Sequence, residues 1–356
     1  MPDTKSRRVL VISLGGTIAM TAAAAGGVAP ALSADQLLAA VPGLAESDIA
    51  VQTHDFRQLP GASLGFDDLT ALAAVIRDRF ADGADGIVVV QGTDTIEETA
   101  YLLDLYHAGP HPVVVTGAMR NPTLAGADGP ANLLAAVQTA ASDQARGLGA
   151  LVVLADEIHT ARRVRKTHST AGATFQSSTG GPLGYLVEGQ PRLLNRLTHR
   201  TVVPDPIAGH RPHIALVTVA LSDDGVLLDG LAERVDGVVV AAFGVGHVPQ
   251  QLVAPLDDLA ARIPVVLASR TGAGPVLAHT YGFPGSERDL LGRGLVSAGF
   301  LDPYKARILL HALAGAGAGA DRKMIAAAFG AAGGYADPDT WPWPATANST
   351  EGTAHA

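Results

Sequence analysis

The sequence predicts an α/β fold, with a mostly parallel sheet covered by helices in a larger N-terminal domain, followed by a smaller α/β C-terminal domain. Three observations support this fold class. Apolar runs typical of buried strands alternate with amphipathic helical runs, the alternation lapses once in a polar segment, and it then resumes. Continuous apolar strands interleaved with helices are characteristic of parallel sheets covered on both faces. With 356 residues, the chain can form a separate core in each of two domains.

The N-terminal part carries four strand-like and four helix-like segments. Short apolar runs predict the strands, and apolar residues at helical spacing predict the helices. The strands are predicted at residues 9–14, 87–90, 113–115 and 151–154, and the helices at residues 34–41, 67–80, 96–106 and 130–140. We place this larger domain at residues 1–195, and we expect it to carry the functional motifs.

A polar, proline-containing segment, QPRLLNRLTHRTVVPDPIAGHRP, interrupts the alternation. We expect a linker at residues 196–212. The smaller domain is predicted at residues 213–331, with strands at residues 214–219, 238–241 and 265–268. Residues 332–356 lack apolar periodicity and are expected to form a disordered tail.

The composition argues against several classes of protein. The net charge is −9, and aromatic residues make up 4%, which gives little basis for nucleic-acid binding. Without cysteine, the chain can form no disulfide, thiolate nucleophile or cysteine-ligated metal site, and it has no HExxH motif. No run is long and apolar enough to predict a membrane span. We therefore expect no cofactor or metal, and neither nucleic acid nor a membrane as a partner.

The first residues, MPDTKSRRVLVISLGGTIA, combine basic residues with an apolar stretch, as a signal peptide does. However, Gly15 and Gly16 interrupt this stretch, and RRVLVISL is more typical of a first strand that ends in a tight turn. We therefore expect a cytoplasmic protein.

The stretch VVVQGTDTIEETAYLLDL, residues 88–105, changes abruptly from an apolar strand to polar residues. Thr95 and Glu98 have the spacing of a capping box, which predicts the start of a helix. Helix capping does not explain Thr93 and Asp94. These two residues come directly after a strand, and open α/β sheets bind ligands at the carboxyl ends of their strands. We therefore predict a ligand-binding site at Thr93 and Asp94.

Another predicted strand also ends in a Gly-Thr pair, in LGGTIA with Thr17. Glycines at such turns let the backbone approach a ligand and leave amides that can face an oxyanion. A threonine hydroxyl is a poor nucleophile unless a base takes its proton. Lys166 in ARRVRKTHST is a candidate base, because lysine can lose its proton among cations whereas arginine cannot. Without further support, a solvated basic loop is the simpler interpretation of Lys166.

Together, LGGTIA, GTDTIEETAYLLDL and RRVRKTHSTAGATFQSSTGGPLGY resemble the three signatures of bacterial-type L-asparaginases. Similar segments are VVVTGAMR, ADGPANLLAAV and GFLDPYKARILL, so the resemblance runs in order over most of the chain. It implies an amidohydrolase that converts L-asparagine to L-aspartate and ammonia through a covalent acyl-threonine. Glutamine is expected as a secondary substrate, because one extra methylene usually discriminates by only about 1–3 kcal/mol.

By the same resemblance, Thr17 is the nucleophile, and Thr93, Asp94 and Lys166 form its companion triad. The family's counterpart of Asp94 also holds the α-amino group of the substrate. This assignment agrees with the chemistry of the side chains. A neutral Lys166 can deprotonate a threonine, and the Asp94 carboxylate can pair with an ammonium group while it orients the lysine.

The resemblance also implies further substrate contacts. Backbone amides beside the two threonines, around Gly16 and Gly92, would stabilise the tetrahedral oxyanion. Family members are typically tetramers in which a neighbouring subunit completes each site, so we expect a homotetramer or a dimer of intimate dimers. By position, Glu287 in PGSERDLL corresponds to the acidic residue that the neighbour donates.

Three positions depart from the family pattern. The mobile lid of the family carries a tyrosine, whereas TAAAAGGVAPALS has none and the first tyrosine of the chain is Tyr101. The serine that binds the α-carboxylate of the substrate falls at Gly61. The backbone amides of Gly61 and Ala62, or the hydroxyl of Ser63, are predicted to replace it. Finally, His247 in GVGHVP occupies the position of a family asparagine.

Two other functions are compatible with parts of the sequence. Residues 61–65 form a GxSxG motif, as in serine hydrolases of the α/β-hydrolase class. However, Pro60 precedes the motif, no convincing strand leads into it, and the helical pattern starts only at Asp67. A non-catalytic amino-acid-binding protein would use many of the contacts of an asparaginase. Lys166 separates the two functions, because a binding protein would tolerate Lys166→Met.

Overall fold

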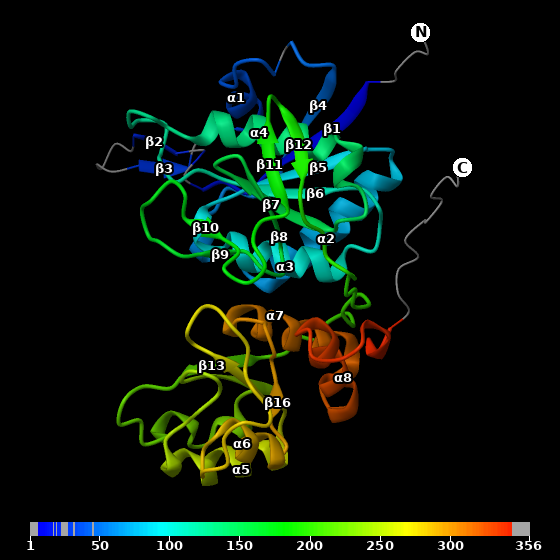
Figure 1. Cartoon of the computed structure of the whole chain (residues 1–356). Helices are drawn as coiled ribbons and strands as arrows, with labels where there is room; N and C mark the ends of the chain where they lie inside the picture. Colours follow the sequence, from blue (N-terminus) through cyan, green and yellow to red (C-terminus); the bar gives the residue numbers. More distant parts are fainter. Residues whose placement is uncertain are drawn as a thin grey trace. The chain divides into compact units, whose positions relative to one another are not determined.

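The computed structural model describes residues 6–16, 18, 20–22, 28–30, 33–44 and 46–343. The chain divides between Arg200 and Thr201 into two compact units (Figure 1). Each unit is built around a sheet that contains parallel strands and is covered by helices. The predicted α/β fold class is therefore confirmed.

An eight-stranded sheet forms the centre of the first unit, in the order β12-β11-β8-β7-β6-β5-β1-β4. Neighbouring strands from β4 to β7 are parallel, whereas β8, β11 and β12 pair in antiparallel fashion. The strands are β1 (Arg7–Ser13), β4 (Ile49–Asp55), β5 (Gly86–Val90), β6 (Val113–Thr116), β7 (Ala150–Leu154), β8 (Glu157–Thr160), β11 (Gly184–Val187) and β12 (Gln190–Leu193).

Helices cover both faces of this sheet. Helices α1 (Ala34–Ala39) and α4 (Gly129–Ala141) lie on one face, and α2 (Phe66–Ala81) and α3 (Ile96–Tyr106) lie on the other (Figure 1). Every residue of β5, β6 and β7 is buried, which explains why these strands are apolar throughout instead of alternating. Short 3₁₀ turns among the described residues of this unit include η2 (Gly61–Ser63), η3 (Thr93–Thr95) and η4 (Asp143–Ala145).

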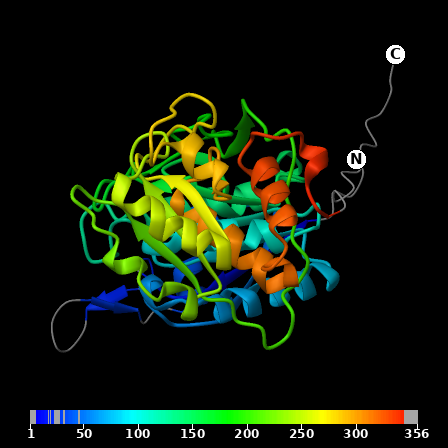
Figure 2. The same ribbon diagram turned by 90° about the horizontal axis from the view of Figure 1, so that it is seen from below.

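Two short antiparallel pairs lie outside the main sheet of the first unit. Strand β2 (Met20–Ala22) pairs with β3 (Val28–Pro30), and β9 (Arg165–Lys166) pairs with β10 (Phe175–Gln176). Figures 1 and 2 both show β2 and β3 as a ribbon that extends away from the rest of the unit.

The strand register places the predicted ligand-binding motifs together. Ser13, the last residue of β1, lies opposite Asp55 of β4 and Val90 of β5. Since these strands are parallel, the loops that follow them leave the sheet at the same edge. That edge therefore carries both Gly-Thr turns that the sequence singles out.

The second unit contains a parallel sheet in the order β13-β14-β15-β16, with α5 on one face and α7 on the other (Figure 1). The strands are β13 (Ile214–Thr218), β14 (Gly237–Ala242), β15 (Val265–Ser269) and β16 (Val296–Ser297). The helices are α5 (Val253–Arg262), α6 (Glu287–Gly292), α7 (Pro303–Leu313) and α8 (Arg322–Ala332), with short turns η5 (Val226–Leu228), η6 (Leu231–Glu233), η7 (Gln250–Leu252), η8 (Ala314–Ala318) and η9 (Pro338–Thr340). In the described ranges of both units, no helix has the length and apolar character needed to cross a membrane.

Residues 333–343 belong to the second unit, contrary to the expectation of a disordered tail from residue 332. Trp341 is 9% exposed, and its indole nitrogen donates a hydrogen bond to the carbonyl oxygen of Val202 at 3.0 Å. Aromatic burial of this kind needs no periodic sequence pattern, which is why the sequence did not reveal it. The remainder of the expected tail, residues 344–356, lies outside the described residues.

Candidate active site

Three loops meet backbone to backbone at the carboxyl end of β1 and β5. Gly15 and Gly16 follow β1 with φ values of 96° and 90°, a region that favours glycine. A Cβ atom on Gly16 would lie 2.0 Å from the amide nitrogen of Gly92, and one on Gly61 would lie 2.9 Å from the Gly92 carbonyl oxygen. Any other residue at Gly16 or Gly61 would force the loops apart. The structure thus brings together the three glycines predicted to line the site.

Thr93, Asp94 and Lys166 are joined by hydrogen bonds at this edge. The Lys166 Nζ donates to Thr93 Oγ1 at 3.0 Å and to Asp94 Oδ1 at 2.9 Å. Thr93 is buried, and the side chains of Lys166 and Asp94 are 15% and 66% exposed. Three of the four residues predicted to be catalytic are therefore in direct contact, with the carboxylate on the solvent side.

A short hairpin holds Lys166 in this place. Lys166 pairs with Phe175 across β9 and β10, and the Phe175 side chain is buried. Beyond this pair, the Thr167 amide and hydroxyl both donate to the carbonyl oxygen of Thr174, at 2.8 and 2.9 Å. Lys166 is therefore not part of a solvated basic loop, which was the simpler interpretation of its sequence.

This arrangement of hydroxyl, amine and carboxylate is suited to proton transfer. A lysine amine within hydrogen-bond distance of a hydroxyl can exchange a proton with it, and a carboxylate on the same amine orients the lysine. The exposed Asp94 can also accept a hydrogen bond from the ammonium group of a ligand. The geometry is therefore compatible with acyl transfer through a threonine.

Thr17, the predicted nucleophile, lies outside the described residues. Residues 23–27, which belong to the tyrosine-free segment after the first motif, lie outside them as well. The neighbouring Gly16 is described, and its contact with Gly92 brings the chain next to the turn that carries Thr93.

The predicted capping box at Thr95 and Glu98 is wrong. The Thr95 side chain makes no capping hydrogen bond, because η3 runs directly into α3 and the Thr95 backbone is not extended. Instead, the Thr95 hydroxyl donates to the Gly61 carbonyl oxygen at 3.0 Å and accepts from Gln91 Nε2 at 3.1 Å. Sequence reasoning missed Gln91. The structure shows that this amide, directly after an apolar strand, is fully buried, which the sequence does not reveal.

The loop at residues 61–65 does not have the geometry of a hydrolase nucleophile elbow. The preceding strand, β4, ends at Asp55, and the following helix, α2, starts at Phe66. A nucleophile elbow requires a strand directly before the serine and a helix directly after it. Within the loop, Gly61 is buried, whereas Ala62 and Ser63 are exposed.

In the second unit, the Glu287 carboxylate is completely buried and already hydrogen-bonded. Its Oε1 accepts from the amides of Thr280 and Tyr281 at 3.0 and 2.8 Å, and its Oε2 lies 3.2 Å from His247 Nε2. Burial alone would raise the pKa of Glu287, but the hydrogen bonds from these backbone amides and from His247 outweigh it and lower the pKa. His247, whose side chain is 25% exposed, is the solvent-facing member of this pair. A direct contact of Glu287 with substrate remains a prediction.

Comparisons with known proteins identify the family. The family model for the N-terminal domain of asparaginases matches residues 8–199, and the model for the glutaminase/asparaginase C-terminal domain matches residues 213–329. The chain belongs to the asparaginase family. The resemblance inferred from the sequence motifs is thus confirmed.

Individual relatives match this asparaginase family member over most of their length. A probable L-asparaginase of Deinococcus radiodurans is 37% identical over 319 residues, which cover 87% of this chain and 94% of the relative. A glutaminase-asparaginase of Pseudomonas aeruginosa is 34% identical over 320 residues, 86% of each chain. The crystal structure of a probable cytoplasmic L-asparaginase from Campylobacter jejuni superposes with a TM-score of 0.82 at 32% identity, covering 91% of this chain and 99% of that one.

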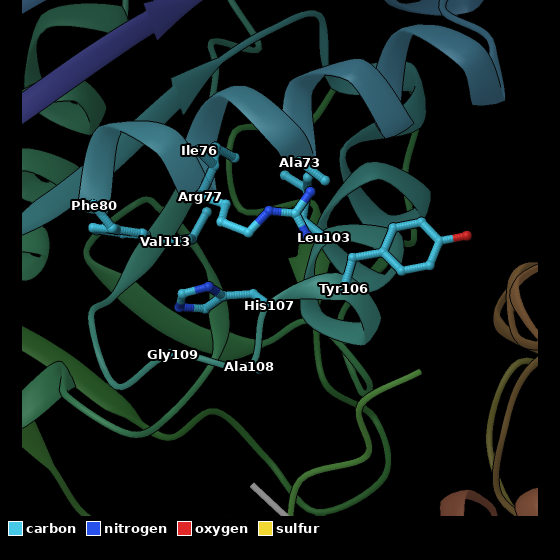
Figure 3. A pocket seen from close by; sticks show the side chains of 10 residues that line it. All are labelled: Ala73, Ile76, Arg77, Phe80, Leu103, Tyr106, His107, Ala108, Gly109 and Val113. Carbon is cyan, nitrogen blue, oxygen red and sulfur yellow. The ribbon is translucent and has the colours of Figure 1, made fainter. Parts of the chain in front are cut away.

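A cavity of about 170 Å³ lies away from the strand-end site, between α2 and α3 (Figure 3). Its lining includes Val113 at the start of β6, whereas the site residues follow the carboxyl ends of the strands. Of the residues predicted for the site, those that the structure describes do not line it. His107 in its wall is neutral at physiological pH, because burial and the nearby Arg200 lower the His107 pKa to about 4.

The contact between Gly16 and Gly92 can be tested with a matched pair of substitutions. Gly43 also has a positive φ, of 78°, but no atom of the described residues would lie within 4 Å of a Cβ there. We expect Gly43→Ala to cost about 1–2 kcal/mol of stability through backbone strain, and Gly16→Ala to cost a further 1–3 kcal/mol or so through overpacking. Urea unfolding measures both values. Equal losses in the two variants would contradict a close backbone approach at Gly16.

The hydrogen bonds to Glu287 predict a pH-dependent contribution to stability. Since folding lowers the Glu287 pKa, the ionised carboxylate stabilises the folded state at neutral pH, and this stabilisation is lost as the pH falls through the folded-state pKa. We expect Glu287→Gln to lower the free energy of unfolding by about 1–2 kcal/mol at neutral pH, and by less in acid. Urea unfolding at several pH values checks this, with the exposed Glu46→Gln as control. A loss that is independent of pH would contradict it.

Proposed function

We propose that this asparaginase family member hydrolyses L-asparagine to L-aspartate and ammonia through a covalent acyl-threonine intermediate, with L-glutamine as a secondary substrate. The observation that carries the proposal is the contact of Lys166 with both Thr93 and Asp94 at the sheet edge where the glycine turns meet. The relatives named as L-asparaginase and glutaminase-asparaginase support the same substrate class.

In the first half-reaction, the Thr17 hydroxyl oxygen attacks the carbonyl carbon of the side-chain amide of asparagine. The negative charge that develops on the carbonyl oxygen is stabilised by backbone amides around Gly16 and Gly92. The C–N bond then breaks, ammonia leaves, and an aspartyl ester remains on Thr17. In the second half-reaction, water attacks this ester, the C–O bond to Thr17 breaks, a proton of the water returns to the Thr17 oxygen, and L-aspartate is released.

Thr93, Asp94 and Lys166 manage the protons of these steps. Lys166 in its neutral form withdraws the proton of the attacking Thr17 hydroxyl through the Thr93 hydroxyl, which it contacts at 3.0 Å, and then delivers this proton to the leaving nitrogen. The α-ammonium of the substrate pairs with the exposed Asp94 carboxylate. This ammonium and the Lys166 amine then contact the same carboxylate.

The remaining contacts complete the proposal. The loop with Gly61, Ala62 and Ser63 receives the α-carboxylate of the substrate, in place of the family serine.

We propose that the enzyme works as a homotetramer or as a dimer of intimate dimers, in which Glu287 of a neighbouring subunit lies near the α-ammonium group of the substrate. By similarity to the probable cytoplasmic L-asparaginase from Campylobacter jejuni, we propose a cytoplasmic location. No cofactor or metal is needed for this chemistry.

Lys166→Met separates catalysis from binding. We expect the wild-type protein to release ammonia from L-asparagine, and we expect Lys166→Met to reduce kcat by about 10²–10⁴-fold, because it removes the group that moves the proton. Lys323→Met is the matched control, because Lys323 is exposed on α8 of the other unit. A coupled ammonia assay measures all three proteins.

A Lys166→Met protein with the wild-type rate would contradict the mechanism. A folded wild-type protein that binds L-asparagine without releasing ammonia would favour the non-catalytic amino-acid-binding function instead.

A further inference from the structure

A chain of hydrogen bonds links the loop before α2 to the turn that carries Thr93 and Asp94. The side-chain nitrogen of Gln91, Nε2, donates to Thr95 Oγ1 at 3.1 Å, and the Thr95 hydroxyl donates to the Gly61 carbonyl oxygen at 3.0 Å. Gln91 is fully buried and Thr95 is half-buried. The hydrogen bonds of the Lys166 amine go to Thr93 and Asp94, so Gln91 and Thr95 have no part in the proposed proton transfers.

We propose that Thr95 is a positioning residue for the α-carboxylate of the substrate, and that Gln91 orients it. The Thr95 hydroxyl holds Gly61, and with it the exposed Ala62 and Ser63, at a fixed distance from Asp94. This inference rests on the proposed asparaginase function, in which the 61–63 loop receives the α-carboxylate while Asp94 receives the α-ammonium. Thr95 therefore sets the spacing between the two groups that recognise an α-amino acid.

The chemistry of the donors and acceptors fixes the direction of this chain. A carbonyl oxygen only accepts hydrogen bonds, so Thr95 must donate its proton to Gly61. The remaining lone pairs of the Thr95 oxygen then accept from Gln91 Nε2, which also donates to the Gly92 carbonyl oxygen at 3.2 Å. Gln91 thus holds the Thr95 hydroxyl in the orientation that reaches Gly61.

The loop is held on its other side by β1 and the residue after it. The Phe56 amide donates to the Ser13 carbonyl oxygen, and the Leu59 amide donates to that of Leu14, both at 2.9 Å. These bonds fix the start of the loop to the first glycine turn. The Thr95 bond fixes Gly61 to the η3 turn, so the loop is held between the two strand ends that carry the catalytic motifs.

Removal of the Thr95 hydroxyl should affect this spacing more than the fold. Without it, the Gly61 carbonyl oxygen still accepts from the Leu64 amide at 3.3 Å, and Gln91 still donates to Gly92. No buried carbonyl loses all of its partners, so the stability cost is small. A loop that is no longer held should bind the α-carboxylate more weakly in both the ground state and the transition state. This raises KM and leaves kcat nearly unchanged.

The experiment compares Thr95→Val, which keeps the shape of the side chain, with Thr95→Ser, which keeps the hydroxyl. We expect Thr95→Val to raise the KM for L-asparagine about tenfold, the equivalent of one strong hydrogen bond, with kcat nearly unchanged. Thr95→Ser should restore the wild-type KM. Gln91→Met should raise KM in the same direction, because it removes the donor that orients Thr95.

A ligand without the α-carboxylate supplies the decisive control. 3-Aminopropanamide is asparagine without this group, so its inhibition constant should be the same for wild type and Thr95→Val. An unchanged KM for asparagine, or an equal weakening of both ligands, would overturn the proposal. Calorimetric binding of L-aspartate repeats the comparison without turnover. A wild-type protein that binds aspartate but releases no ammonia would contradict the proposed function, and the Thr95→Val comparison would still decide the positioning role.

Discussion

The close approach of Gly16 and Gly61 to Gly92 is the constraint on which the rest of the site depends. A Cβ atom at either flanking glycine would overlap the backbone of Gly92, so these loops can meet only where side chains are absent. Parallel pairing of β1 with β5 brings the loops to one edge of the sheet, and the glycines let them touch. Thr93 and Asp94 follow Gly92 directly, so this contact fixes their positions.

Lys166 adds an amine that can accept and return a proton. Its amine lies between the hydroxyl of Thr93 and the carboxylate of Asp94, and it reaches both from the β9–β10 hairpin. An arginine in this place would keep its proton and could only act as a fixed cation. The side chain is mostly shielded from water, whereas the Asp94 carboxylate is not. The site therefore combines a sheltered proton carrier with a solvent-facing anion that a substrate ammonium can reach.

The sequence predicted the fold where local periodicity carries the signal. The helix expected at residues 96–106 has those bounds, and the strand expected at residues 87–90 differs by one residue from β5. The motifs also indicated that Thr93, Asp94 and Lys166 act together, and the structure joins them. The failures have a different physical origin. Thr95 matched a local capping pattern, but its hydroxyl bonds to Gly61, which is distant in sequence.

A sequence pattern does not predict the tertiary contacts of Gln91, Glu287 and Trp341. By its position in the sequence, Glu287 was predicted to be an acidic residue that contacts the substrate. The sequence did not predict that two backbone amides and His247 already surround its carboxylate. The Gln91 side chain donates hydrogen bonds to Gly92 and Thr95, and Trp341 donates one to Val202, which is far away in the chain. Each of these contacts depends on tertiary structure, which hydrophobic periodicity does not encode.

The most direct test of the account is to identify the residue that carries the acyl group. Enzyme mixed with L-asparagine is quenched in acid within the first turnovers, digested, and analysed by peptide mass spectrometry. We expect an added aspartyl group on the peptide that contains Thr17, and its absence after Thr17→Ala. An aspartyl group on Thr93 instead, or ammonia release at the wild-type rate by Thr17→Ala, would contradict it.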